Sequence, residues 1–169
     1  MKTIRSRLVG SHFFVIFIAV SIFVGFLIFS VHQYYIDNVK DIVLTQSETS
    51  ALFYNRYLAT DNLNNDAEEL IASFSENTNA QVQIIDSEGV LLQDSVRQAE
   101  GEPMEHYSDV RSALNGMTGI WKGNLGKTGE PVLAVSEPLI YDNEVVGAVR
   151  FVTSLEAVNE TIFSISFML

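Results

Sequence analysis

A run of 24 residues near the N-terminus carries no formally charged side chain, and it constrains the fold more than any other feature. It extends from Leu8 to Val31 and reads LVGSHFFVIFIAVSIFVGFLIFSV. At about 1.5 Å of rise per residue, a helix of this length exceeds the ~30 Å hydrocarbon core of a bilayer. A cleaved signal peptide has a shorter apolar segment, followed by a small-residue cleavage site that SVHQYY does not provide. The sequence therefore predicts an uncleaved transmembrane helix over residues 8–31.

Charge predicts the orientation of this helix. Three of the ten basic residues, Lys2, Arg5 and Arg7, precede the apolar run, whereas all 21 acidic residues follow it. Because basic flanks prefer the cytoplasm, we expect residues 1–7 to be a cytoplasmic tail at the cell membrane and residues 32–160 to be extracytoplasmic. The chain beyond the run carries seven basic and 21 acidic residues, a formal net charge of −14. Such acidity argues against a nucleic acid as a partner.

Several classes of active site lack their residues or motifs in this chain. There is no cysteine, which excludes a thiolate nucleophile, a disulfide framework and an all-cysteine zinc site. The serines have no nucleophile-elbow context, and we predict no catalytic residue, no cofactor and no metal site. The acidic groups within 61–69 and 100–106 lack EF-hand spacing and are interpreted as solvated loops. Binding of divalent cations by the acidic outer part is kept as a minor hypothesis.

The segment Trp121–Glu130, WKGNLGKTGE, contains the letters GKT that end many phosphate-binding loops. Such a loop requires G-x-x-x-x-G-K-[ST] between a strand and a helix. The first glycine of that pattern falls on Trp121, and the residues after Thr128 include Pro131 and are typical of a strand. The segment is therefore interpreted as a glycine-rich hairpin and not as a nucleotide site.

The spacing of apolar residues changes from helical to alternating along the chain. Helical spacing predicts a long helix over residues 32–59 and a second helix with Asn65 as its N-cap and a buried stripe of Leu70, Ile71 and Phe74. The alternation predicts five strands, over residues 81–86, 90–92, 119–122, 131–138 and 145–152. Strands joined by short turns indicate an antiparallel sheet and an α+β fold.

Turn and cap residues separate these elements. Tight turns are predicted at Asp86–Gly89 and at Tyr141–Glu144. A short helix is predicted from Ser108, as N-cap, through Leu114, ending at Asn115–Gly116.

The last nine residues, 161–169, are uncharged and mostly apolar. They are too few to cross a bilayer as a helix, and an exposed apolar end is unfavourable in water. We interpret them as the truncated start of a second transmembrane helix. The alternative is a terminal helix that docks on its own domain.

Few side chains in the sheet half are suited to recognise an anion. The aromatic and basic ones are Tyr107, Arg111, Trp121, Lys122, Lys127 and Arg150. An anionic ligand would need some of them as donors. The alternative interpretation makes Trp121 a core residue and leaves Arg111 and Lys122 as surface charges.

The layout resembles the N-terminal sensor half of a bacterial two-component sensor histidine kinase. The stretch from Gln81 to Ser95, with its QIIDSEGVLLQDS pattern, is similar to the first hairpin of the extracytoplasmic PAS-like fold, also called single Cache. The stretch from Val110 to Phe151 is similar to the later half of that fold in Gram-positive kinases of the WalK and PhoR type. SLEAVNETI resembles the segment that leads to their second transmembrane helix. The resemblance implies a five-stranded antiparallel sheet with a long N-terminal helix.

The resemblance also implies where a ligand binds. Pockets of that family lie between the sheet and the loops around the third and fourth strands, which by position implicates Arg111, Trp121, Lys122 and Ser136. With Tyr107, these residues form the predicted ligand-binding set. The expected partner is an unidentified small ligand or an envelope protein.

These observations predict the signal-sensing and transmembrane signalling module of a sensor histidine kinase. A ligand would shift the segment from Phe151 onward relative to the helix that follows Val31, within a homodimer formed through residues 32–59. The chain itself is not expected to be an enzyme, and a parent kinase would carry catalysis in residues outside this sequence. The alternatives are the input domain of a chemoreceptor or cyclic-dinucleotide enzyme, and a membrane-anchored accessory protein without an output domain.

Overall fold

The computed structural model describes residues 4–55, 63–76, 78–96, 101–125 and 128–156, and only the backbone of residues 4–11. Contacts divide the chain into two units, Asn38–Ala157 and the two terminal segments Met1–Asp37 and Val158–Leu169. The predicted start of a second transmembrane helix, at residues 161–169, lies outside the described residues.

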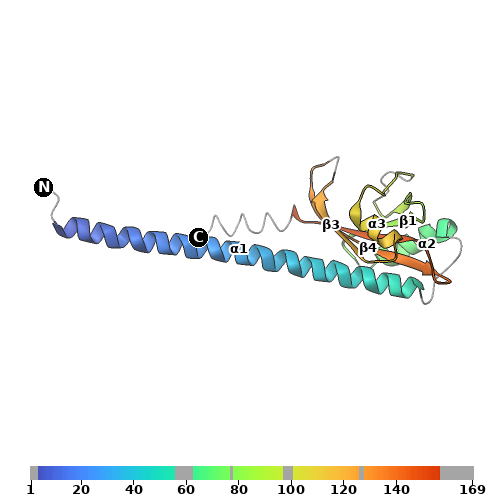
Figure 1. The fold of residues 1–169 in the computed structure, drawn as a ribbon, viewed down its shortest axis with the longest axis horizontal. Coiled ribbons are helices and arrows are strands. Elements are labelled where there is room, and N and C mark those ends of the chain that lie inside the picture. Colours follow the sequence, from blue (N-terminus) through green and yellow to red (C-terminus); the bar gives the residue numbers. More distant parts are fainter. Residues whose placement is uncertain (1–3, 56–62, 77, 97–100, 126–127, 157–169) are drawn as a thin grey trace. The chain divides into compact units, whose positions relative to one another are not determined.

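A single helix, α1 (Ile4–Phe53), contains both the predicted transmembrane helix and most of the long helix predicted to follow it (Figure 1). Among the described residues, it is the one helix long and apolar enough to cross a membrane, with a mean hydropathy of 2.9 in its most apolar window. None of that window is buried within the chain. The predicted helix end at residue 59 lies outside the described residues.

Residues 38–157 are built on a five-stranded antiparallel sheet with the order β2-β1-β5-β4-β3. Its strands are β1 (Gln81–Asp86), β2 (Leu91–Asp94), β3 (Gly119–Asn124), β4 (Pro131–Tyr141) and β5 (Glu144–Ser154). The predicted α+β class and the five strands are confirmed, although β2 begins one residue later than predicted and the last four strands extend further. The most apolar strand, β5, pairs with β1 on one side and with β4 on the other. This central position explains its composition, because both of its faces are covered.

The predicted turns are confirmed, and their residues explain them. The Oδ1 atom of Asp86 accepts hydrogen bonds from two backbone N–H groups of its turn, at 2.9 and 2.8 Å, and Gly89 has φ 79°. In the β4–β5 hairpin, Asp142 and Asn143 have φ 47° and 68°. Two successive positive φ values suit a two-residue hairpin loop, and aspartate and asparagine tolerate them better than other non-glycine residues.

The segment WKGNLGKTGE connects β3 to β4 as a hairpin. The N–H of Leu125 donates to the carbonyl oxygen of Glu130 at 2.9 Å, and the N–H of Gly129 donates to that of Leu125 at 2.8 Å. Strands flank the loop on both sides, and β4 stands where a phosphate loop would require a helix. The prediction of a hairpin in place of a phosphate loop is confirmed, and Lys127 lies outside the described residues.

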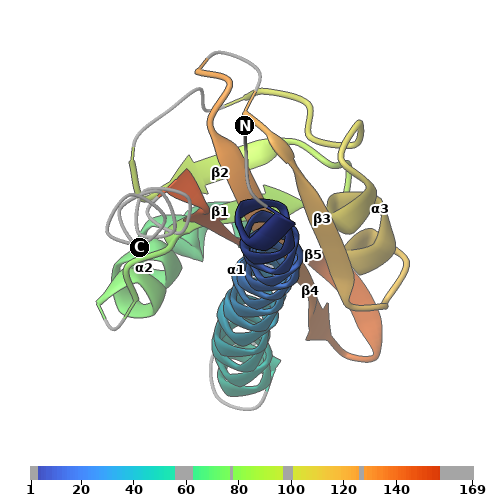
Figure 2. The same ribbon diagram turned by 90° about the vertical axis from the view of Figure 1, so that its left-hand side faces the viewer.

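Helices cover both faces of the sheet (Figure 2). The last turns of α1 and the helix α2 (Leu63–Ser75) pack on one face, and the helix α3 (Ser108–Leu114) packs on the other. Two predicted N-caps are wrong. The helix α2 begins at Leu63, whose buried side chain anchors its first turn in the core, so Asn65 already lies within the helix. The cap of α3 is the extended residue Tyr107, and Ser108 is its first helical residue.

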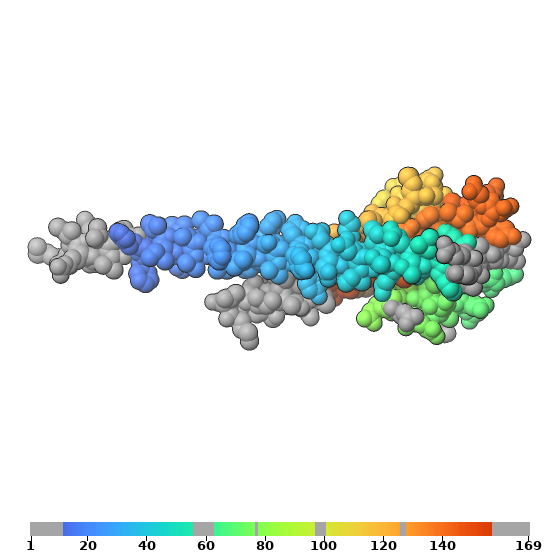
Figure 3. All heavy atoms as spheres, turned by 90° about the horizontal axis from the view of Figure 1, so that it is seen from below, coloured from blue at the N-terminus to red at the C-terminus, as the bar shows by residue number. Residues whose placement is uncertain are grey.

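The face under α1 and α2 carries the larger core. Figure 3 views this side, with the teal end of α1 in front and the green α2 region beside it. Leu70 and Phe74 of the predicted stripe are buried, and Ile71 is partly buried against them. The buried residues of this core are Val43, Ala51, Tyr54, Leu63, Ala67, Leu70, Phe74, Ala80, Val82, Ile84, Val135, Leu139, Val149 and Phe151.

Candidate ligand-binding site

A row of polar side chains crosses the face of the sheet that α3 covers. Cross-strand pairing aligns Asp94, Gln83, Arg150 and Ser136, on β2, β1, β5 and β4, and Gly119 of β3 completes the line. Residues paired across neighbouring strands share a face. These five positions, called the polar row below, separate two apolar clusters, one around Ile85, Leu91 and Ala148 and one around Val132, Ala134 and Val152.

The central residue of the polar row is a buried charge. Arg150 is 1% exposed, and its Nε donates to Oδ2 of Asp109, a residue of α3 with no exposure, at 2.7 Å. Its Nη1 donates to Oε1 of Gln83 at 3.1 Å, and the hydroxyl of Ser136 donates to the same Asp109 oxygen at 2.9 Å. Removing two charges from water costs several kcal/mol per ion, so a buried pair requires such additional hydrogen bonds.

The position of Asp109 depends on a glycine, Gly119, in the neighbouring strand β3. A Cβ atom at Gly119 would overlap the backbone of Asp109. Because this end of the polar row has no side chain, the first turn of α3 approaches the sheet closely. That approach brings the Asp109 carboxylate within reach of Ser136 and Arg150.

Two aromatic rings pack against the guanidinium of Arg150. Its Cζ lies 4.1 Å from the centroid of the Tyr107 ring and 5.6 Å from that of Trp121. The two rings meet edge to face, with centroids 4.9 Å apart and an interplanar angle of 73°. Cation–π attraction is stronger for a desolvated cation. The aromatic residues therefore add to the forces that hold Arg150 in place.

On the other side of Arg150, hydrogen bonds continue the polar row to β2. The Nε2 atoms of Gln83 and Gln81 donate to Oδ2 of Asp94 at 2.9 and 2.7 Å. The second oxygen of Asp94 accepts the backbone N–H of Val96 at 2.8 Å. The polar side chains thus form one network from Ser136 to Gln81.

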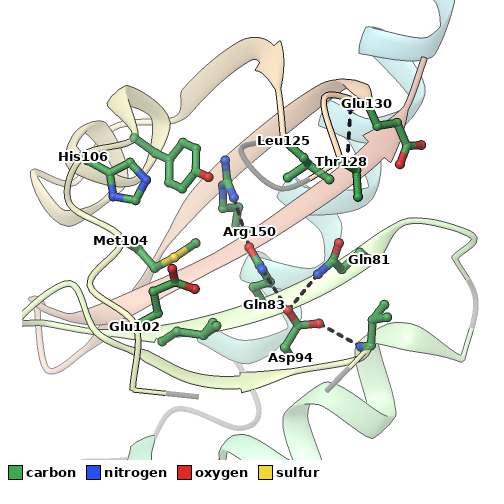
Figure 4. Close-up of a pocket in the computed structure, with 13 residues that line it drawn as sticks. Gln81, Gln83, Asp94, Glu102, Met104, His106, Leu125, Thr128, Glu130 and Arg150 are labelled. Carbon is green, nitrogen blue, oxygen red and sulfur yellow. Dashed lines mark hydrogen bonds between the residues drawn. The ribbon is translucent and has the colours of Figure 1, made fainter. Parts of the chain in front are cut away.

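A cavity of about 420 Å³ lies against this network, and Figure 4 shows Arg150 among the residues around it. Its volume falls within the range of small-molecule sites, roughly 300–1,000 Å³. It is lined by Gln81, Gln83, Leu91, Asp94, Val96, Glu102, Met104, His106, Tyr107, Leu125, Thr128, Glu130 and Arg150.

Backbone hydrogen bonds fix one wall of the cavity, the segment that precedes α3. The N–H of Met104 donates to the carbonyl oxygen of Gly89 at 2.7 Å, and the N–H of Leu91 donates to that of Glu102 at 3.0 Å. The β3–β4 hairpin contributes further lining residues, Leu125, Thr128 and Glu130. The cavity is therefore bounded by the sheet, by this segment and by the hairpin.

The site contains buried polar atoms without hydrogen-bond partners and carboxylates without a matching positive charge among the described residues. Among the described residues, Arg150 Nη2 and Asp109 Oδ1 are buried without a hydrogen-bond partner. Buried polar atoms without a partner are costly and uncommon in native proteins. In addition, the described lining residues include three carboxylates, those of Asp94, Glu102 and Glu130, and one guanidinium. The described lining thus carries an excess of negative charge.

The structure brings together three of the five residues predicted to bind a ligand. Tyr107 lines the cavity, and Trp121 and Ser136 lie behind its lining, in the contacts described above. Arg111 and Lys122 are exposed and do not line it. Lys122 follows Trp121 in β3, so strand alternation directs it to the opposite face of the sheet. A role for any of the five in binding stays a prediction.

The prediction did not include Gln83, Asp94 and Asp109 of the network, and it named Arg150 among the candidate anion donors but not in the predicted ligand-binding set. A signal for Arg150 was present, because it is the one charged residue within VVGAVRFV, the most apolar strand. A charge in such a strand must find a partner. The partner Asp109 lies 41 residues away. Its role depends on how α3 docks, which local sequence does not reveal.

Glu102 and His106, from the acidic group considered for metal binding, line the cavity separately. Among the described residues, no three or more His, Cys, Asp or Glu side chains are grouped to hold a metal ion.

No family model and no curated protein matches this chain. Among solved structures, it is similar to the ligand-binding domain of the Campylobacter jejuni chemoreceptor Tlp3 in complex with L-norvaline, with a TM-score of 0.64 and 13% identity over 80% of this chain and 59% of that one. It is also similar to the sensor domain of the V. cholerae histidine kinase DctB, with a TM-score of 0.53 and 15% identity over 76% of this chain and 57% of that one.

A third similar structure is the ligand-binding domain of the Pseudomonas aeruginosa PAO1 amino acid chemoreceptor PctC in complex with GABA. Its TM-score is 0.56, with 19% identity over 85% of this chain and 64% of that one. The chain thus spans less than two thirds of each of these structures. At such identities the likeness establishes the fold alone, and it confirms the predicted Cache-like fold.

Proposed function

We propose that residues 38–157 are the extracytoplasmic input domain of a membrane-anchored signalling protein and that a small polar ligand binds in the cavity over the polar row. The observation that carries this proposal is the cavity of about 420 Å³, which is lined by a buried arginine whose Nη2 atom has no hydrogen-bond partner among the described residues. The fold shared with sensor domains and the apolar part of α1 support it.

The chemistry of the lining favours a ligand that carries both an ammonium and a carboxylate group. The part of the cavity next to the Arg150 guanidinium is suited to a carboxylate or carbonyl acceptor of the ligand. The carboxylates of Asp94, Glu102 and Glu130 would repel a plain anion and attract an ammonium group. The Tlp3 and PctC domains were solved with isoleucine, L-norvaline and GABA, which all carry both groups. A small amino-acid-like zwitterion therefore suits this cavity.

Binding would be linked to signalling through α3 and β5. The Tyr107 ring, at the start of α3, packs on the guanidinium of Arg150 in β5. A ligand acceptor that reaches Nη2 of Arg150 would compete with this packing and change the relative stability of two arrangements of α3 on the sheet. A ligand shifts such an equilibrium only by its difference in affinity for the two states.

The output is proposed to be a histidine kinase of a two-component system, of the WalK and PhoR type, located in residues outside this sequence. A chemoreceptor output suits the same domain equally well, because both kinds of protein occur among the similar structures. The sequence that follows Leu169 in the gene distinguishes them. The basic residues before the apolar run support a cytoplasmic N-terminus.

A homodimer through α1 is part of this proposal. Ile42 and Phe53 are 52% and 46% exposed, and they lie on one side of the helix because 11 residues make about three turns. The chain has no cysteine, so single cysteines introduced along residues 36–57 report on one position each. We expect symmetric cross-links to recur every three or four positions. Cross-links without helical periodicity would contradict a dimer through α1.

The ligand class is tested on the full chain in lipid nanodiscs, with isothermal titration calorimetry against three kinds of compound. These are amino acids and GABA, carboxylates without an amine, and amines without a carboxylate. We expect measurable binding from the first kind alone. Glu102→Gln and Thr128→Val should weaken that binding by about 10-fold each, because the first removes a negative charge from the lining and the second removes a hydroxyl group.

Lys122→Ala is the matched control, since this exposed residue lies outside the cavity. The control should bind as the parent chain does. If carboxylates and amines bind as well as amino acids, or if Lys122→Ala weakens binding as much as Glu102→Gln, the proposed site is wrong.

A further inference from the structure

The opposite face of the sheet contains a buried carboxylate with an unmet acceptor. Glu137 of β4 is 6% exposed, and it pairs across the sheet with the fully buried Val149 of β5. Its Oε2 accepts a hydrogen bond from the hydroxyl of Thr118 at 3.0 Å, whereas its Oε1 has no partner among the described residues. Burying a carboxylate with one unpaired oxygen is unfavourable unless a further group satisfies it.

Glu137 lines a second cavity, of about 240 Å³, where the end of α1 meets β4 and the start of β3. In Figure 3 the teal end of α1 crosses the face of the domain on this side. The cavity is lined by Glu48, Ala51, Leu52, Asn55, Thr118, Glu137 and Pro138. It lies on the other side of the sheet from the polar row, so the two cavities are separate.

Two carboxylates line this cavity, and none of its described lining residues carries a positive charge. Burial raises the pKa of Glu137, the Thr118 hydrogen bond lowers it, and the negative charge of Glu48 on α1 raises it. No lysine, arginine or histidine is among the described residues that line the cavity. Glu48 itself is exposed, and its negative charge makes the charged form of the buried Glu137 less favourable unless a cation lies between them.

The polar side chains among the described lining residues all offer oxygen atoms. The Oδ1 atom of Asn55 accepts the backbone N–H of Ile140 at 2.8 Å and retains a second lone pair. The hydroxyl of Thr118 donates to Glu137, which leaves its own lone pairs available. Carboxylate, amide and hydroxyl oxygens, without sulfur or imidazole, are the ligands preferred by hard divalent cations.

We propose that this cavity binds one hard divalent cation, Ca²⁺ or Mg²⁺, between Glu48 of α1 and Glu137 of β4. Asn55, Thr118 and water molecules complete the coordination. Two protein carboxylates make a weak site, so we expect a dissociation constant of about 10⁻⁴–10⁻³ M, as in extracellular calcium modules. The bound cation would tie the last turns of α1 to the sheet.

The test uses the full chain in nanodiscs of zwitterionic lipid, with NaCl holding the ionic strength constant. Equilibrium dialysis with ⁴⁵Ca²⁺ should detect one site per chain, and competition with Mg²⁺ ranks the two ions. Ten millimolar Ca²⁺ or Mg²⁺ should raise the unfolding midpoint by about 3–6 °C, because a ligand that binds only the native state stabilises it.

Glu137→Gln and Glu48→Gln should each abolish binding and the rise in midpoint. Glu69→Gln, at an exposed position of α2, is the matched control and should keep both. Glu137→Gln should also be more stable than the parent chain in EDTA, since it removes the buried charge and keeps the shape. This gain shows that the variant folds.

Two outcomes overturn the proposal. In the first, Glu137→Gln is more stable than the parent chain in EDTA, but neither cation raises the unfolding midpoint of the parent chain. Glu137 then binds a proton and no metal ion. If Glu69→Gln loses as much ⁴⁵Ca²⁺ binding as Glu137→Gln does, the cations bind to the acidic surface as a whole and not in this cavity.

Discussion

The two faces of the sheet differ in how completely they close. Under α1 and α2, 14 buried residues form one apolar cluster, with Glu137 as the exception within β4. Under α3, the polar row leaves two smaller clusters, of six and three buried residues. Apolar side chains fill space against any neighbour, whereas polar ones require partners in fixed directions. The face with the polar row therefore retains the larger of the two cavities described above, about 420 Å³ against about 240 Å³.

The largest effect that separates the two faces is expected from Asp109→Ala. It leaves Arg150 buried without its ion-pair partner, which costs about 3–5 kcal/mol of unfolding free energy. Urea unfolding of the full chain measures this loss. Adding Arg150→Met should recover part of it, because replacing both partners of a buried pair is far less costly than removing one. A loss within about 0.5 kcal/mol for the single variant would mean that the ion pair does not hold α3 on the sheet.

Gly119→Ala should have the next largest effect, because the added Cβ would overlap the backbone of Asp109. Overpacking of this kind costs about 1–3 kcal/mol, again measured by urea unfolding. Ligand affinity should fall with stability, since Asp109 orients Arg150. Lys122→Ala, exposed on the same strand, is the control. Equal stability of the two variants would show that α3 does not need the close approach.

The sequence predicted the fold well and the candidate site only in part. The strands and their turns were predictable because alternation, Asp86, Gly89 and the glycine-rich hairpin act locally. The N-cap of α2 was not, because burial of Leu63 overrides the local preference for Asn65. Asp109 was missed for the same kind of reason, since its role arises from α3 docking on Gly119.

On the apolar face, a smaller effect is expected in the pH dependence of stability, through Glu137. Because the pKa of folded Glu137 is raised above the unfolded value of 4.5, the folded chain binds a proton that the unfolded chain has released. The stability contributed by this residue therefore falls as pH rises from 4.5 through the folded pKa, and the full penalty persists above it. In EDTA, Glu137→Gln should remove this part of the pH profile in urea unfolding. Identical profiles for parent and variant would contradict the burial of a charged Glu137.

Arg111→Ala should have the smallest effect. Arg111 is exposed on α3 and does not line the cavity, so we expect a stability change within about 0.5 kcal/mol and unchanged ligand affinity in calorimetry. If the variant binds the ligand 10-fold more weakly, Arg111 contributes to binding, and the binding site extends further along α3 than the cavity does.

The place of β5 in the sheet has a consequence for the order of folding. The hairpin β1–β2 and the strands β3 and β4 all precede β5 in the chain, yet β1 joins the rest of the sheet only through β5. During synthesis, β1 and β4 each present an unpaired edge until the last strand arrives. Open edges invite pairing with other chains, and contacts between distant parts of a chain slow folding. A chain that ends before Glu144 would therefore expose two unpaired sheet edges and be prone to aggregate.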